Sequence, residues 1–223
     1  MAFPDPDRQS RMFLHVENRY LNCQAEIGNA DQIVEQFRRH RDDTLVVYGR
    51  KSGHAISRQN NFVVALFAAE NWTDALKECD VLLEMLDDAE LTESKRYDIV
   101  LGIKALILTE LGQINEAVLI ADKVFQSQKI TPPWNSFMLY IRSQKAAQDG
   151  DLKKAITMTS GTFGFLVGNS KDYQVLLQRR IVAQIGNFLR ELHIQNGDET
   201  AAAELESRML QYERETSNQF DKD

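Results

Sequence analysis

Proline and cysteine are scarce in this chain of 223 residues. The four prolines stand only at positions 4, 6, 132 and 133, which leaves two long stretches without a helix-breaking residue. Good helix formers dominate these stretches, so we expect a helical chain in which Pro132-Pro133 separates two helices. Cys23 and Cys79 are too few for a disulfide framework, which favours a reducing compartment.

Long apolar segments are also missing. No run approaches the roughly 18–20 residues of a membrane span, and the first ten residues lack the basic and apolar regions of a secretion signal. We therefore predict a cytoplasmic protein with no membrane partner. We expect one domain over residues 8–217, with 1–7 and 218–223 as flexible ends.

Catalytic motifs are missing too. The sequence has no GxxxxGK[ST], GxSxG, HExxH or GxGxxG. The run GRKSGH (49–54) lacks the first glycine of a phosphate-binding loop, so we interpret it as the loop before a helix. The four histidines have no metal-ligand spacing. We predict no catalytic residue, no metal and no cofactor, and hence no enzyme; a hidden enzyme is the alternative.

Charge is unevenly distributed. The net charge is −7, and acidic residues concentrate after position 198. Basic residues concentrate between Arg38 and Arg58. We interpret Arg38, Arg39 and Arg41 as a solvated segment that follows a helix, where cations suit the carbonyl end of the dipole. An acidic partner is the alternative, and nucleic acid is not expected because the chain is acidic and Tyr48 is the only interleaved aromatic residue.

A repeat underlies the helical pattern. Five segments pass through a polar turn into a helix with apolar positions at i, i+3 and i+7. The aligned turn residues are Gly28, Glu70, Gly112, Gly150 and Gly197. Two residues later stand Ala30, Trp72, Ile114, Leu152 and Glu199, and five residues after the turn stand Ile33, Ala75, Ala117, Ala155 and Ala202. Glycine suits a left-handed turn, and a small residue one turn into a helix allows close packing, so each unit is expected to be a helix-turn-helix hairpin.

The segment 104–125 carries the pattern most clearly. Ala105, Gly112, Ile114 and Ala117 stand where the tetratricopeptide repeat (TPR) family has a small residue, glycine, an apolar residue and alanine. The chain resembles that family, in its long 42-residue variant. The resemblance implies an all-α, right-handed superhelix of about five hairpins. A helix from about 198 to 217 is expected to cap its C-terminal end.

The segment 160–170 departs from the pattern. Gly161, Gly164 and Gly168 are expected to break the second helix of the fourth hairpin. The segment is interpreted as a buried connector, with a mobile lid or partner-docking strip as the alternative.

The resemblance also implies a concave face lined by the first helix of each hairpin. The residues it places there as partner-binding candidates are Asn18, Arg19, Asn22, Asn60, Asn61, Tyr140 and Gln144. A carboxamide both donates and accepts, so asparagines can pair with an extended peptide backbone. Ile103, Leu106 and Ile141 are expected to add an apolar anchor site. The basic clamp that similar proteins use for C-terminal carboxylates is not reproduced, because Asn18, Ile99 and Ile103 occupy its positions.

These observations predict a non-catalytic scaffold or adaptor that binds another protein or a peptide. One alternative is a regulatory sensor subunit that changes shape on binding and acts through a partner. Another is self-association through the ends of the solenoid.

Overall fold

The structure is a computed structural model that describes residues 14, 15, 17, 18, 20, 21, 30–169 and 176–217. Those residues form nine numbered helices and no strand, and the described residues between 14 and 21 are helical as well. The expected all-α fold is therefore confirmed. The chain divides into two compact units, Met1–Gly112 and Gln113–Asp223. The expected flexible ends, 1–7 and 218–223, lie outside the described residues.

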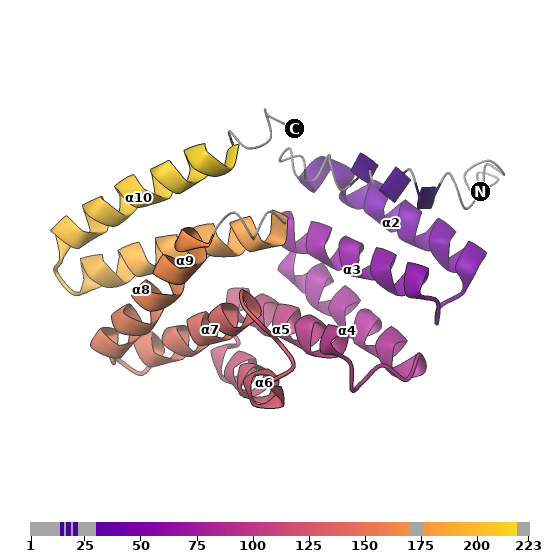
Figure 1. Ribbon diagram of the computed structural model, residues 1–223, viewed down its shortest axis with the longest axis horizontal. Helices are drawn as coiled ribbons and strands as arrows, with labels where there is room; N and C mark the ends of the chain where they lie inside the picture. The colour runs from indigo at the N-terminus through magenta and orange to yellow at the C-terminus, as the bar shows by residue number, and fades with distance from the viewer. Residues whose placement is uncertain (1–13, 16, 19, 22–29, 170–175, 218–223) are drawn as a thin grey trace. The chain divides into compact units, whose positions relative to one another are not determined.

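The first unit contains four numbered helices. They are α2 (Ala30–Tyr48), α3 (Gly53–Ala68), α4 (Trp72–Asp88) and α5 (Lys95–Glu110). Each packs against the next one along the chain, as Figure 1 shows for α2, α3 and α4. Arg41 on α2 ties three of them together, because its guanidinium donates to Gln59 on α3 (3.0 Å) and to Glu78 on α4 (2.8 Å).

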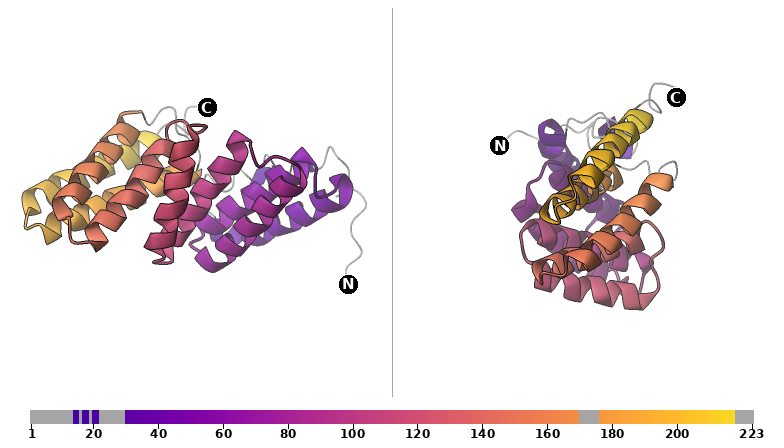
Figure 2. Two further views of the ribbon diagram at one scale, coloured as in Figure 1. Left: turned by 90° about the horizontal axis from the view of Figure 1, so that it is seen from below. Right: turned by 90° about the vertical axis from the view of Figure 1, so that its left-hand side faces the viewer.

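The second unit contains five helices. They are α6 (Ile114–Ser127), α7 (Trp134–Gln148), α8 (Leu152–Gly168), α9 (Leu176–Gln195) and α10 (Glu199–Ser217). Neighbours in sequence again pack together, as Figure 1 shows for α9 and α10, and Figure 2 gives two further views of the helices. A buried cluster of Ala146, Ala155 and Leu192 joins α7, α8 and α9.

The predicted turn residues adopt the left-handed conformation. The φ angle is +57° at Glu70, +74° at Gly112, +84° at Gly150 and +76° at Gly197, while Gly28 lies outside the described residues. In each of the four described turns the next helix begins two residues later, as the repeat predicts.

Buried small residues follow each of these turns. Ala75, Ala117 and Ala155 are completely buried, and Ala202 is almost so. Side-chain caps fix several helix starts as well. The carboxylate of Asp151 accepts from the Lys154 amide (3.1 Å), and that of Asp198 accepts from the Ala201 amide (3.0 Å).

The prediction of a break at 160–170 is wrong over the described residues. Helix α8 continues through Gly161 and Gly164 and ends at Gly168. Glycine weakens a helix without forbidding it, and burial of Phe163 and Leu166 favours continuation. Residue 170 lies outside the described residues.

The interpretation of Arg38, Arg39 and Arg41 as following a helix is also wrong. They lie inside α2, which ends at Tyr48. The clustered charges therefore have different environments: Arg38 is exposed beside Glu35, whereas the side chain of Arg41 is largely buried in its network. Among the described residues, no helix is both long enough and apolar enough to span a membrane.

Candidate ligand-binding groove

Two predicted contact residues in the first unit bind each other. The Asn61 amide on α3 donates to the Asn18 carbonyl at 2.9 Å, and both side chains are half-buried. This pair fixes α3 to the helical residues between 14 and 21. The sequence analysis assigned both amides to a ligand, and this bond occupies one polar group of each. Ligand contact by this pair stays a prediction.

Asn60, the neighbouring predicted residue, lies in an open groove. The groove has a volume of about 340 Å³. Its lining residues are Ser57 and Asn60 from α3 and Lys95, Arg96 and Ile99 from α5. The structure therefore places one predicted carboxamide opposite two cations.

A helix cap and side-chain hydrogen bonds hold the two helices around the groove in place. Ser94 caps α5 by accepting from the Tyr97 amide at 3.2 Å, which places Lys95 and Arg96 in the first turn. Gln59, adjacent to Asn60, donates to the Glu78 carbonyl oxygen (2.8 Å) and to its carboxylate (2.9 Å). The groove thus lies on two helices whose positions are fixed independently of any ligand.

Sequence reasoning did not include Lys95 and Arg96 among the site residues. On α5 it considered Ile99, which lies one helical turn after Lys95 and Arg96. Residues three and four positions before Ile99 share its side of a helix, so the 3.6-residue period was the signal that would have found them. Arg96 is exposed and forms no ion pair with a carboxylate of the described residues. It can therefore bind an external anion.

The remaining predicted site residues are placed differently. In the second unit, Tyr140 is only 3% exposed and makes an edge contact with the Phe188 ring, with centroids 5.7 Å apart. Gln144 is half-buried on the same helix. Arg19 and Asn22 lie outside the described residues. Ligand contact by these four residues stays a prediction, and a buried ring such as Tyr140 offers a ligand little surface.

The expected apolar anchor site is not exposed. Ile103, Leu106 and Ile141 are each at most 2% exposed, so these side chains belong to the core. On α5 every residue from Val100 to Thr109 except Lys104 is buried. Ile103 and Leu106 are therefore not available to a ligand on this helix.

Several ionisable groups of the first unit are buried away from the groove. Burial raises the pKa of the Cys79 thiol to about 12, and this thiol donates to the Val100 carbonyl oxygen (3.6 Å). Burial lowers the pKa of His40, an effect opposed by Glu17, whose carboxylate lies 2.8 Å from Nδ1. No group of three potential metal ligands occurs among the described residues. These groups are parts of the structure that supports the groove.

Comparison with solved structures places this helical arrangement among known repeat folds. A kinesin light chain-like protein of Podosopora anserina, with nearly identical TPR-like repeats, has a TM-score of 0.53 and 14% identity, over 96% of this chain and 99% of that chain. A variant of that protein gives a TM-score of 0.55 over 95% and 98%, also at 14% identity. BtubC (BKLC) from P. vanneervenii gives 0.58 at 11% identity, over 96% and 84%. The fold is TPR-like.

No family model and no curated protein matches the sequence. At 11–14% identity the structural likeness establishes the fold alone. Any function for the TPR-like chain must therefore be argued from its own residues.

Proposed function

We propose that this protein is a non-catalytic scaffold that binds an acidic, extended segment of a protein partner along the groove between α3 and α5. The observation that carries the proposal is the pairing of a carboxamide with cations across that groove. Asn60 can donate to and accept from a peptide backbone, while Arg96 can bind a carboxylate side chain through two N–H groups.

The TPR-like fold supports the proposal in a general way. Stacked hairpins present extended surfaces that commonly hold other polypeptides. The composition adds selectivity, because a chain of net charge −7 repels acidic partners except where cations collect. The groove with Lys95 and Arg96 is such a place. A cytoplasmic partner protein is the expected ligand source.

The test is fluorescence anisotropy with the full chain and labelled ten-residue peptides. One set is rich in Asp and Glu, and the matched set carries Asn and Gln at the same positions. We expect binding of the acidic set. Arg96→Ala should weaken it about tenfold or more, and Asn60→Ala should weaken it about threefold to tenfold, from the usual size of charged and neutral hydrogen bonds.

Arg39→Ala is the matched control, because it removes an exposed cation from α2 of the same unit. It should change the affinity less than twofold. Equal binding of both peptide sets, or equal losses in Arg96→Ala and Arg39→Ala, would contradict the proposal.

The sensor alternative is supported by the division of the chain into two compact units at Gly112. It predicts that the radius of gyration in solution scattering changes when an acidic peptide binds. A rigid scaffold predicts an unchanged radius. Self-association is tested by the mass from light scattering at several concentrations, which should stay constant for a monomeric scaffold.

A further inference from the structure

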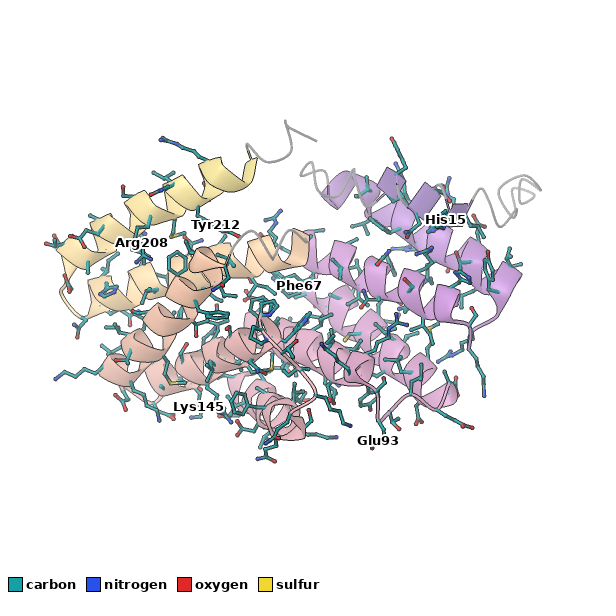
Figure 3. The ribbon with its side chains drawn as sticks, viewed as in Figure 1. His15, Phe67, Glu93, Lys145, Arg208 and Tyr212 are labelled. Carbon is teal, nitrogen blue, oxygen red and sulfur yellow. The ribbon has the colours of Figure 1, made fainter. Side chains whose placement is uncertain are left out.

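A second, smaller cavity lies in the first unit, away from the groove. Its volume is about 30 Å³, and it is lined by the helical residues near position 15, the end of α2 and the start of α3. Its lining residues are Leu14, His15, Thr44, Tyr48, His54 and Arg58. Figure 3 labels His15 in this part of the unit.

Arg58 is the unusual member of this cavity. It is only 9% exposed, yet it forms no ion pair with a carboxylate of the described residues. Burial lowers the pKa of its guanidinium, and Tyr48 is the only group that acts in the opposite direction. Burial of a charge without a counter-charge is unfavourable, so an anion bound beside Arg58 would be stabilising.

Two other arginines of the unit, Arg41 and Arg50, are paired with carboxylates. Arg41 is paired with Glu78 at 2.8 Å, and Arg50 is paired with Glu84 at 2.9 Å and Asp88 at 3.1 Å. Arg58 therefore differs from these neighbours in lacking a carboxylate partner within the described part of the chain, while being more deeply buried than the exposed Arg50.

Nearby carboxylates do not fill this role. Glu17 lies 2.8 Å from His40 Nδ1, and Asp43 acts on the pKa of the same imidazole. Neither acts on the pKa of Arg58. Among the described residues, no carboxylate is therefore assigned to Arg58 as its counter-charge.

The size and donors of the cavity define the anion. A space of 30 Å³ holds about two waters, which matches the two oxygens of a carboxylate better than the four of a phosphate. The guanidinium of Arg58 can hold both oxygens at once. Tyr48 and His54 also line the cavity, with their ring centroids 4.4 Å apart, and add a hydroxyl and ring nitrogens to it.

We propose that this cavity is a carboxylate-binding site in which Arg58 holds the two carboxylate oxygens beside Tyr48 and His54. The carboxylate belongs to a small free acid or to a peptide end. This site is independent of the α3–α5 groove, because the two share no lining residue.

The test is thermal unfolding of the full chain at constant ionic strength, with sodium acetate or N-acetylglycine replacing sodium chloride. Acetate should raise the midpoint by about 3–6 °C at ten times its dissociation constant. Arg58→Met keeps the length of the side chain without the charge. It should abolish the shift, and its midpoint in chloride should equal or exceed that of the wild type.

Arg50→Met is the control, since it removes an exposed cation from the same unit and should retain the acetate shift. His54→Ala removes an exposed ring that lines the cavity and should reduce the shift. This variant replaces Arg58→Met as the test if Arg58→Met does not fold. A response to N-acetylglycine as well as acetate identifies a peptide carboxylate, and a response to acetate alone identifies a free acid. The proposal is overturned if wild type shows no shift, or if Arg58→Met or, where that variant does not fold, His54→Ala keeps the full shift.

Discussion

At the scale of single residues, Glu70 is the exception among the repeat turns. It adopts a φ angle of +57° where the equivalent described turns have glycine. A side chain in the left-handed region costs about 1 kcal/mol relative to glycine. Glu70→Gly should therefore raise the free energy of unfolding by about 1 kcal/mol, as measured by urea denaturation.

The reverse substitution provides the control for Glu70. Gly112 has a φ angle of +74° and no atom within 4 Å of an added Cβ, so only the backbone conformation opposes a side chain there. Gly112→Ala should lower the free energy of unfolding by about 1 kcal/mol. An unchanged stability in both variants would mean that these turns are not strained.

Glu110, at the end of α5, makes stability depend on pH. Burial raises the pKa of its carboxyl group, and the charge of Glu70 raises it further. A raised folded-state pKa gives stability that is fully present below the unfolded value of 4.5 and lost as the pH rises through the folded value. Glu110→Gln should therefore stabilise the protein at pH 7 and have little effect at pH 4.

Chemical denaturation at the two pH values checks this difference. Because Glu70 contributes to the shift, Glu70→Gly and Glu110→Gln combined should give less than the sum of their separate gains at pH 7. Equal effects of Glu110→Gln at both pH values would rule out the proposed ionisation.

At the scale of helices, α8 shows that glycine need not end a helix. Gly161 and Gly164 lie within Leu152–Gly168, and an added Cβ would meet no atom within 4 Å at either position. Gly161→Ala and Gly164→Ala should each stabilise the protein by about 0.5–1 kcal/mol, since alanine has the higher helix propensity.

Gly186 on α9 is the contrasting position. A Cβ there would lie 2.7 Å from Met209 Sδ and 3.0 Å from a Phe163 ring carbon. Gly186→Ala should therefore fail to stabilise the protein, despite the same gain in propensity. Guanidinium denaturation measures the free energy of unfolding of all three variants and so compares their stabilities. Destabilisation by Gly161→Ala and Gly164→Ala would contradict the continuous helix.

The sequence predicted the helical elements well where local chemistry sets them. The turn residues Glu70, Gly112, Gly150 and Gly197 were found from spacing alone, because a left-handed turn and a buried small residue recur in every described unit of the repeat. The break at 160–170 was wrong because composition does not reveal the burial of Phe163. The sequence predicted only part of the groove, since Asn60 lies in it. Tyr140 and Ile103 were also predicted to contact a ligand but are buried, because packing between helices decides which side chains are covered.

At the scale of the whole molecule, the proposed function predicts a salt dependence. Attraction between an acidic peptide and Lys95 and Arg96 is screened by salt, especially against the net charge of −7. Raising sodium chloride from about 50 to about 500 mM should weaken binding of acidic peptides several-fold and leave Arg96→Ala less affected. Anisotropy titrations at several salt concentrations measure this, and a salt-independent affinity would exclude a charge-based site.

The central claim is that a partner segment lies along α3 and α5 in the first unit. Photo-cross-linking tests it most directly, with an acidic peptide that carries a diazirine and mass spectrometric identification of the linked residues. The account predicts cross-links to the groove around Ser57, Asn60 and Ile99, and their loss in Arg96→Ala. Cross-links confined to the second unit, or unchanged in Arg96→Ala, would contradict it.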